Sequence, residues 1–380
     1  MGRSIFFIIT IMFFYISMTC VHIPYAYRKS SLLFPEYGRQ EVSPGGSQSD
    51  IPSIEKSSPQ SRIVPSHKEN LENNDNDAVS SEKNQVRVNY YDIPAPEFVR
   101  GIYISNRTVN SRKSLERIIE DARKNRINTF VVDVQNEMVP REFVTMIKNA
   151  GIFPVARIVV FLGGLTTKTP PEKYIGNLLS VMDAAAYQGF LEVQLDYIRY
   201  ADTKEMEKIP LSFKYKTINS ILEKTHEKAN SLSIFLSADL FGRVTINEND
   251  SIGQKLENFS KFADVIYPML YPSHYTNDDY RISHPYETVK EGLENSLKRC
   301  KNTKIVAYLQ GFTWRVNQSG KSFTEYLKDQ LQAVDDAGGN GWIIWNAGND
   351  YDHSFEAIAS YDRMKRKKVS RLESGPKELL

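Results

Sequence analysis

The feature that most constrains the fold is a regular alternation of short apolar runs with longer amphipathic segments across residues 98–365. This alternation is typical of α/β proteins, in which each strand of a parallel sheet is followed by a helix that packs on it. The strand candidates are "VRGIYIS" (99–105), "TFVVDVQ" (129–135), "FPVARIVVF" (153–161), "FLEVQLDYI" (190–198), "SIFLSADLF" (233–241), "DVIYPMLY" (264–271), "KIVAYLQGF" (304–312) and "GWIIWNAG" (341–348). Eight repeats in this length predict a single (β/α)8 TIM barrel rather than a doubly wound sheet.

The segments between these runs have the spacing of helices, as in "SLERIIEDARKN" and "SFTEYLKDQLQAVDDAGG". Several of them end in Gly or Asn, where a helix commonly stops. The barrel domain is therefore expected to span residues 96–365.

The fourth strand candidate has an apolar face and an acidic face. Strand side chains alternate with a period of two, so Glu192, Gln194 and Asp196 point to the same side. In a barrel this face points inward, and Asp196 then stands at the C-terminal end of its strand, where such folds place their chemistry. The fifth strand candidate repeats the pattern with Ser237 and Asp239. We expect both aspartates to open on one pocket.

Residues 1–27 are expected to direct the chain out of the cytoplasm. Arg3 precedes an apolar run that ends near Cys20, which is the pattern of a secretory signal peptide. The run is also long enough for an uncleaved membrane anchor, and Cys20 could accept a lipid. The protein is predicted to be exported, and either secreted or anchored to the cell envelope.

Two further segments lack periodic apolar positions. Residues 28–95 are rich in Ser, Pro, Asn and Glu and are predicted to form a disordered linker. Residues 366–380 are predicted to form a basic polar tail in solvent.

Composition and motif absences narrow the function classes. The chain has 48 Lys and Arg against 46 Asp and Glu, which argues against a nucleic-acid partner. A metal-dependent amidohydrolase barrel would need a His-x-His on its first strand, and "GIYIS" has no histidine. We expect no metal and no other cofactor. The oligomeric state does not follow from the sequence.

Five strings carry a resemblance to a known family: "EVQLDYIRY", "LSADLFG", "DVIYPMLYPSHY", "HPYE" and "GWIIWNAGN". In this order, across residues 99–351, they resemble a bacterial family of unknown function that is grouped with the glycoside hydrolases and has an amylase-like barrel. Members of that family carry "FDYVRFP" where this chain has "LDYIRY", and the loops after the third and fourth strands look shortened here. The resemblance implies a fold and a reaction class, not a substrate.

The resemblance implies that Asp196 is the nucleophile and Asp239 the acid or base of a glycosidase. Such cleavage needs one carboxyl group to protonate the leaving oxygen and a second to attack the sugar or activate water. Arg157 and Arg199 could keep the nucleophile ionised by charge-assisted bonds. Alternatively, either aspartate could serve only in an ion pair with these arginines.

Further residues are candidates for substrate binding. Asp133 ends the second strand and Glu137 follows it, so either could supply an acid or bind a sugar hydroxyl. Near the ends of the last three strands lie groups that could stack on sugar rings or bond their hydroxyls, with core packing as the competing explanation for the tyrosines: Tyr267, Tyr271, His274, Trp314, Trp345 and Asn346.

These observations predict a glycoside hydrolase that acts on an envelope or extracellular polysaccharide, with retention of configuration. The competing interpretation is a barrel that binds carbohydrate or serves as a cell-envelope scaffold without turnover. The shortened loops and the long linker would fit that alternative. The two interpretations differ in whether Asp196 has an acid partner at catalytic distance.

Overall fold

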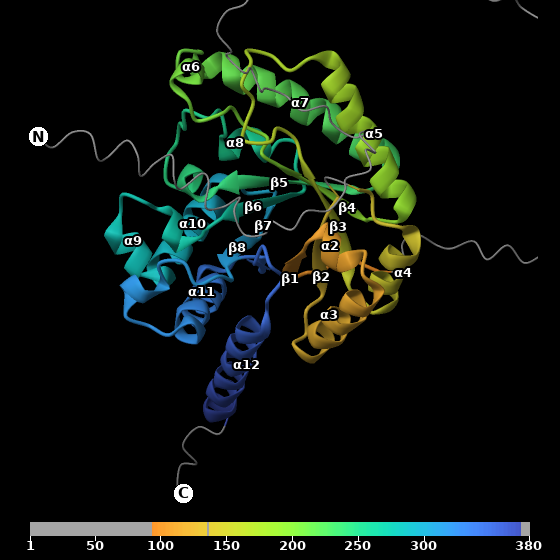
Figure 1. The fold of residues 1–380 in the computed structure, drawn as a ribbon. Helices are drawn as coiled ribbons and strands as arrows, with labels where there is room; N and C mark the ends of the chain where they lie inside the picture. The colour runs from red at the N-terminus through yellow and green to blue at the C-terminus, as the bar shows by residue number, and fades with distance from the viewer. Residues whose placement is uncertain (1–92, 135–136, 374–380) are drawn as a thin grey trace, which may run out of the picture. The chain divides into compact units, whose positions relative to one another are not determined.

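The computed structural model describes residues 93–134 and 137–373, which form a closed parallel barrel with helices around it (Figure 1). The strands are β1 (Val99–Ile104), β2 (Thr129–Asp133), β3 (Phe153–Val159), β4 (Glu192–Asp196), β5 (Phe235–Phe241), β6 (Val265–Met269), β7 (Lys304–Ile305), β8 (Ala307–Gln310) and β9 (Gly341–Trp345). Neighbouring strands follow the order β5-β4-β3-β2-β1-β9-β8-β6, and β5 also pairs with β6, which closes the ring. The predicted (β/α)8 barrel is confirmed.

The seventh predicted strand, 304–312, is divided into β7 and β8. Both segments pair with β6, so they occupy one position in the barrel. The break falls at Val306, whose backbone N–H still donates to Ile266 O at 3.0 Å. The barrel therefore has eight strand positions within the described residues.

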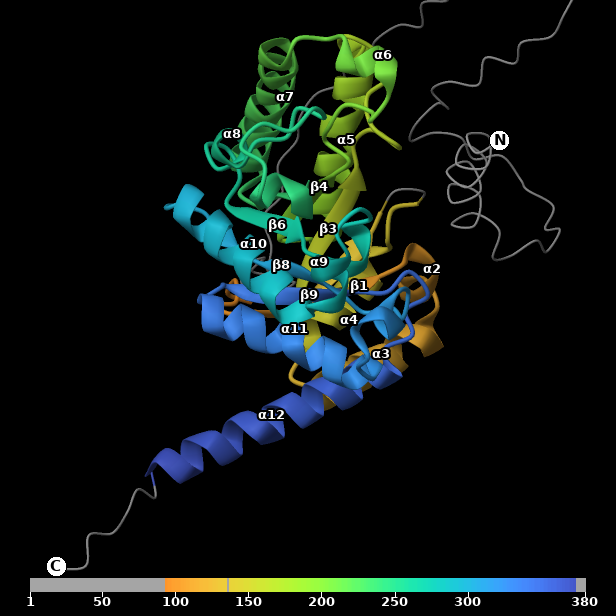
Figure 2. The same cartoon turned by 90° about the vertical axis from the view of Figure 1, so that its left-hand side faces the viewer.

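The longer helices form the outer layer of the domain (Figure 1, Figure 2). They are α3 (Arg112–Lys124), α4 (Arg141–Asn149), α5 (Glu172–Gln188), α7 (Leu211–Leu232), α10 (Pro285–Arg299), α11 (Phe323–Ala337) and α12 (Asp352–Glu373). Short helical turns lie in the connections: α2 (Asn106–Val109), α6 (Lys204–Glu207), η1 (Gly242–Thr245), α8 (Leu256–Phe259), η2 (Pro272–His274), α9 (Asp279–Ser283) and η3 (Val316–Ser319).

Local sequence signals account for several helix ends. Helix α11 begins with a capping box, in which Ser322 and Glu325 each accept a backbone N–H of the other residue. Helices α5 and α11 end at Gly189 and Gly338, with φ of 100° and 73°. These left-handed conformations are accessible to glycine without strain, so the glycines stop the helices where the sequence predicts.

The fifth βα unit lacks a long helix. After β5 the chain passes through η1 and a polar loop to the short α8. An ion pair of 2.8 Å between Arg243 and Asp250 and a bond of 2.5 Å from Lys214 Nζ to Ser251 O hold this loop. The loop thus forms part of the rim at the C-terminal end of β5.

The predicted phase of the fourth and fifth strands is confirmed. Gln194 pairs in register with Ser237, and both are fully buried inside the barrel. Tyr308 OH donates to Gln194 Oε1 at 2.9 Å, and Ser237 Oγ donates to Glu192 Oε1 at 2.6 Å. The polar face of β4 therefore points into the interior, as the period of two requires.

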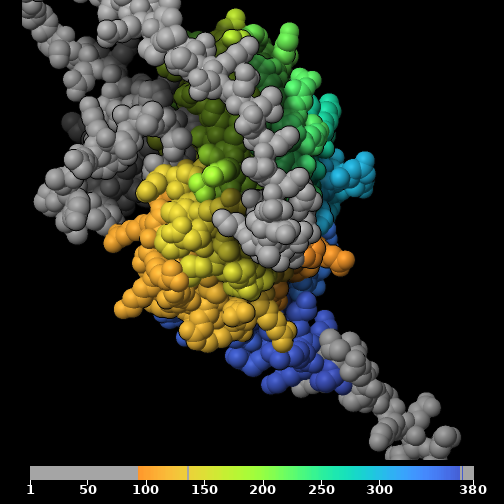
Figure 3. Space-filling model, turned by 90° about the vertical axis from the view of Figure 1, so that its right-hand side faces the viewer, coloured from red at the N-terminus to blue at the C-terminus, as the bar shows by residue number. Residues whose placement is uncertain are grey.

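Helix α12 packs beside the neighbouring strands β1 and β9. Arg100 on β1 forms an ion pair of 2.9 Å with Asp362 on α12, and its guanidinium lies over the Trp342 ring of β9. Helix α12 continues past residue 365 to Glu373, and its residues 363–368 are exposed. Figure 3 shows this helix in blue, below the face that the first βα units form.

The predicted signal peptide or anchor (1–27) and nearly all of the predicted linker (28–95) lie outside the described residues. Across 93–134 and 137–373, none of the helices combines the length and apolar character that a membrane crossing requires.

Closure of the barrel should depend on Gly341. It pairs with Val99 of β1 at φ 135°, and a Cβ there would lie 2.2 Å from Val99 O. We expect Gly341→Ala to lower the free energy of unfolding by roughly 2–4 kcal/mol in urea titrations. The matched control is Gly176→Ala within α5, where an added Cβ would meet no neighbouring side chain or packed element within 4 Å. Alanine there should raise the free energy of unfolding by about 0.5–1 kcal/mol. Equal effects of the two changes would contradict the close approach of β9 to β1.

Candidate active site

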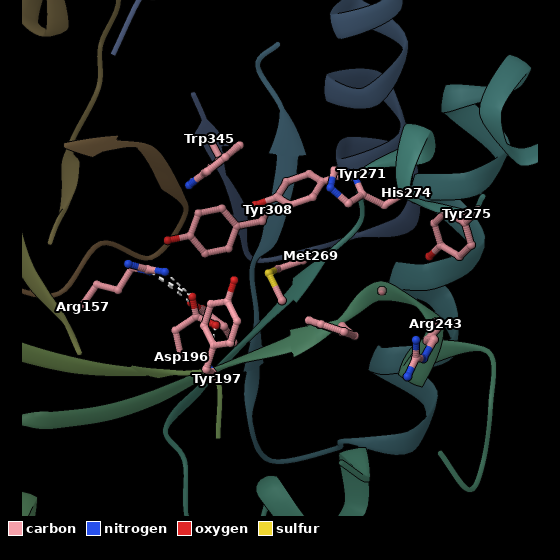
Figure 4. A pocket seen from close by; sticks show the side chains of 13 residues that line it. Arg157, Asp196, Tyr197, Arg243, Met269, Tyr271, His274, Tyr275, Tyr308 and Trp345 are labelled. Carbon is pink, nitrogen blue, oxygen red and sulfur yellow. Dashed lines mark hydrogen bonds and ion pairs between the residues drawn. The ribbon is translucent and has the colours of Figure 1, made fainter. Parts of the chain in front are cut away.

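A cavity of about 300 Å³ opens at the C-terminal end of the strands (Figure 4). Asp196 and Asp239 line it together with Arg157, and aromatic side chains that include Tyr271 and Trp345 form much of the remaining wall. The cavity therefore lies where (β/α)8 enzymes place their active sites.

Asp196 is the last residue of β4, and the chain turns sharply after it. Tyr197 has a φ of 54°, a left-handed conformation that costs on the order of 1–3 kcal/mol for a residue with a Cβ. In this conformation the Tyr197 N–H donates to Asp196 Oδ1 at 2.6 Å, and Tyr197 itself lines the cavity. The strained turn thus fixes the orientation of the carboxylate.

Arg157 on β3 supplies the positive charge of the site. Its Nε donates to Asp196 Oδ2 at 3.0 Å, and its Nη2 donates to the same oxygen. Its Nη1 lies 3.4 Å from Asp133 Oδ2, and its Nε lies 4.0 Å from Asp239 Oδ2. One guanidinium therefore faces three carboxyl groups in a mostly dehydrated setting, and the charge is not balanced if all three are ionised.

Asp239 is the carboxyl group that relieves this imbalance. It is 2% exposed, and its Oδ1 has no hydrogen-bond partner among the described residues. Burial is the main cause that raises its pKa well above the ordinary value, and the nearby Asp196 carboxylate raises it further, while Arg157 opposes both. The surroundings of Asp239 therefore favour its protonated form, whereas Asp196 bonds directly to the arginine.

The two aspartates are close enough to act on one bond. Asp196 Oδ2 lies 3.0 Å and Asp239 Oδ2 lies 4.0 Å from the same nitrogen, Arg157 Nε, so the two oxygens are at most about 7 Å apart. This limit is compatible with the ~5–5.5 Å spacing between the carboxyl groups of retaining glycosidases.

A third acid lies deeper in the barrel. Glu192, at the start of β4, is 4% exposed and accepts hydrogen bonds from Ser237 Oγ at 2.6 Å and Tyr267 OH at 3.0 Å. Burial raises the pKa of Glu192 to about 7, although the two hydroxyl donors act in the opposite direction. The alternation of "LEVQLD" indicated this residue as inward-facing, but it gave no sign of an altered pKa.

The wall away from Asp196 is aromatic. Tyr271 lies 5.9 Å from Trp345 and 5.2 Å from His274, measured between ring centroids. Burial lowers the pKa of His274 to about 4, so its imidazole is neutral near pH 7 and can donate or accept a hydrogen bond. Its Nδ1 lies 3.2 Å from Ser273 Oγ.

Arg199 takes a different position from the one the sequence suggested. Its Nη1 donates to Tyr200 O at 3.0 Å, and its guanidinium lies between the rings of Tyr197 and Phe241. Within the described residues it is not part of the cavity wall, and the cation that bonds to Asp196 is Arg157. Because Tyr197 turns the chain after the strand, Arg199 is directed behind the wall instead of toward Asp196.

Four other predicted residues also lie behind or beside the cavity. Tyr267 is 1% exposed and bonds to Glu192 one layer deeper. Asp133 accepts from Tyr103 OH at 3.1 Å and faces Arg157. Asn346 Nδ2 donates to Gly311 O at 2.7 Å, which connects the loops after β9 and β8. Glu137 is exposed, and its backbone carbonyl accepts from Asn106.

Several cavity residues were not predicted from the sequence. Tyr197 directly follows β4, Phe241 is the last residue of β5, Arg243 lies two residues further on, and Tyr275 follows η2. Their positions next to predicted catalytic residues were a usable signal. Tyr308 lies inside the seventh strand position, where its side chain could equally have been core.

Fold and site together define a (β/α)8 barrel with an acidic pair at the C-terminal end of β4 and β5. Residues 174–351 match the family model described as "Putative glycosyl hydrolase domain", which confirms the resemblance. The matched segment contains Asp196 and Asp239, whereas Arg157 precedes it. A comparison with curated proteins found no match.

Solved structures with the same barrel include glycan-degrading enzymes. The endo-β-1,4-mannanase of Thermotoga petrophila has a TM-score of 0.54 at 12% identity, over 71% of this chain and 77% of its own. The endo-1,4-β-mannanase of Rhizomucor miehei has a TM-score of 0.53 at 8% identity, over 72% and 96%. The spore cortex-lytic enzyme SleL of Bacillus megaterium has a TM-score of 0.50 at 12% identity, over 70% and 75%. At such low identity these similarities establish the fold alone.

Glu192 should make stability depend on pH. Its carboxyl group has a pKa near 4.5 in the unfolded chain and about 7 in the fold. The unfolded state therefore loses this proton first as pH rises, and stability falls between these two values by roughly 3 kcal/mol. In Glu192→Gln this contribution should be absent, so the unfolding free energies of variant and parent should diverge from pH 4.5 to 7. A constant difference across that window would show that Glu192 titrates normally.

Proposed function

We propose that this protein is a glycoside hydrolase that cleaves a polysaccharide with retention of configuration, with Asp196 as nucleophile and Asp239 as acid and base. The observation that carries the proposal is geometric: Asp196 Oδ2 accepts from Arg157 Nε at 3.0 Å, and the buried Asp239 Oδ2 lies 4.0 Å from the same nitrogen. Glycoside cleavage requires one ionised and one protonated carboxyl group across one bond, and the raised pKa of Asp239 suits this residue to the protonated role.

In the first step the proton of Asp239 passes to the glycosidic oxygen while Asp196 attacks the anomeric carbon. The bond to the leaving sugar breaks, and an ester forms between the remaining sugar and Asp196. Arg157 keeps Asp196 ionised before the attack by bonding to its Oδ2. The Tyr197 N–H on Oδ1 limits rotation of the carboxylate, which favours attack from one direction.

In the second step Asp239 acts as a base. The loss of the negative charge on Asp196 in the ester removes the like charge that raised the pKa of Asp239. Asp239 can then take a proton from water as the water oxygen attacks the anomeric carbon, which releases the sugar and restores both carboxyl groups. The change in electrostatic partner thus suits Asp239 to both roles.

The wall composition supports carbohydrate as the substrate. Aromatic rings bind the apolar faces of sugars, and the neutral His274 and the tyrosine hydroxyls can bond to sugar hydroxyls. The solved structures with similar barrels suggest β-1,4-mannan and purified spore cortex as the first polysaccharides to test.

Replacing each aspartate separately tests the proposed roles. We expect Asp196→Asn to lower turnover by several orders of magnitude on every substrate, because the covalent catalyst is lost. Asp239→Asn should lower turnover strongly on polysaccharide but much less on an aryl glycoside whose phenolate leaves without protonation. Reducing-sugar release and phenolate absorbance measure the two substrates, and thermal unfolding controls for folding.

The pH dependence gives a second test of Asp239. The parent should lose activity on polysaccharide as pH rises through the raised pKa of Asp239, since the acid form disappears. The residual activity of Asp239→Asn should lack this alkaline limb. Hydrolysis by Asp196→Asn at the parent rate would refute the assignment. Binding of glycans by the parent without any cleavage would instead support a carbohydrate-binding or scaffold barrel.

We also propose that the protein is exported and acts outside the cytoplasm, attached to the envelope or released. The support is the apolar run after Arg3 and the polar composition of residues 28–95. Fractionation of cells that express the full chain should place it in the envelope or the medium, and removal of residues 1–27 should retain it in the cytoplasm. Cytoplasmic recovery of the full chain would contradict export.

A further inference from the structure

A tryptophan lies at the surface beside the cavity, on a loop that hydrogen bonds from a buried side chain hold in place. Trp314, between β8 and η3, is 39% exposed. Single exposed apolar residues are common in soluble proteins, so exposure alone assigns no role. The surroundings of this residue provide the argument.

The loop that carries Trp314 is fixed by a fully buried side chain. Gln310 Nε2 donates to Phe312 O at 3.0 Å and to Trp314 O at 2.9 Å. Gln310 Oε1 accepts the backbone N–H of Ser273 in η2 at 3.2 Å. One buried amide thus ties the Trp314 loop to the turn that carries His274, and a buried polar group satisfied in this way makes the loop rigid.

Two further contacts hold the indole. Arg315 has a φ of 60°, a left-handed conformation that reverses the chain directly after Trp314. Its guanidinium lies 5.7 Å from the centroid of the Trp314 ring and 3.7 Å from Asp279 Oδ1 on α9. The position of the ring is therefore set by the loop and by the neighbouring helix.

Trp314 continues a row of rings that begins inside the cavity. Centroid distances are 5.9 Å from Trp345 to Tyr271, 5.2 Å from Tyr271 to His274 and 5.4 Å from His274 to Trp314. The first three residues line the cavity, and Figure 4 shows them on the side away from Asp196. Trp314 is outside the cavity lining, so a single sugar that fills the cavity does not also cover it.

We propose that Trp314 is the platform of an outer sugar subsite, so the preferred substrate is a glycan chain that extends out of the cavity along this row. The proposal rests on the proposed function, since it takes the cavity to be the site of cleavage. A sugar unit beyond the cavity stacks on the indole, while the units near Asp196 and Asp239 react. Short substrates that end inside the cavity gain nothing from Trp314.

Steady-state kinetics of the full chain separate this role from a structural one. With β-1,4-mannan as probe, Trp314→Ala should raise KM by roughly 3- to 10-fold, the loss of one ring contact, and leave kcat within about 2-fold. The KM for an aryl mannoside should not change. Trp314→Phe should recover much of the loss. The matched control is Tyr187→Ala, an aromatic residue 71% exposed at the C-terminal end of α5, the opposite end of the barrel from the cavity.

A binding measurement keeps the subsite and the catalytic function distinguishable. Electrophoresis through gels that contain β-1,4-mannan or solubilised spore cortex glycan should retard the parent and Tyr187→Ala more than Trp314→Ala, whether or not cleavage occurs. Such retardation without cleavage would refute the hydrolase but support the subsite. Equal behaviour of Trp314→Ala and Tyr187→Ala in both gels would overturn the subsite, as would an equal rise in KM for polymer and aryl mannoside.

Discussion

The site depends on one buried guanidinium shared by several carboxyl groups. Arg157 bonds to Asp196 and also lies near Asp133 and Asp239, in a setting where each unpaired charge is costly. A positive charge favours the ionised form of an acid to which it bonds directly. Its effect is weaker on a buried acid 4.0 Å away, such as Asp239, for which burial favours the protonated form. The two residues have the same chemistry and are both buried, so what distinguishes Asp239 is its greater distance from the guanidinium. In the proposed mechanism, the same arrangement allows Asp239 to change from acid to base once Asp196 forms the ester.

The regular strands of the barrel are sufficient to produce this geometry. The register pairs Arg157 on β3 with Gln194, and Gln194 with Ser237, so Asp196 and Asp239 stand one inward-facing position above Arg157. The long side chain of Arg157 spans that step, and the three residues meet without a dedicated binding loop. The layer below is polar too, with Glu192 bonded to Ser237 and Tyr267. This lower layer is satisfied by hydroxyl donors, which allows acidic residues to remain inside a packed core. The strained turn at Tyr197 departs from regular strand geometry directly after Asp196.

The sequence predicted the barrel and its inward-facing residues, which depend on periodicity. It missed the position of Arg199, which depends on how the chain turns after β4. The period of two placed Gln194 and Ser237 inside correctly, and the alternation of runs predicted the barrel, because both are properties of regular strands. Arg199 was grouped with Asp196 since it lies three residues later, but the left-handed conformation of Tyr197 sends it behind the wall. For the tyrosines the sequence left sugar contact and core packing open: Tyr267 lies within β6 and reaches Glu192, whereas Tyr271 follows the strand and lines the cavity. How far along a strand a residue must lie to line the cavity depends on the geometry of the whole barrel, and a local sequence pattern does not contain this information.

The central claim is that Asp239 is the proton-holding acid beside Asp196, which is bonded to Arg157. Carbon-13 NMR of protein labelled at the aspartate carboxyl carbons measures the protonation of both aspartates directly, with the two signals assigned from the Asp196→Asn and Asp239→Asn variants. Our account predicts that the Asp239 signal keeps the chemical shift of a carboxylic acid to a pH well above the ordinary range of an aspartate, because burial and the nearby Asp196 raise its pKa. An Asp239 signal that changes to that of a carboxylate within the ordinary range of an aspartate would contradict it.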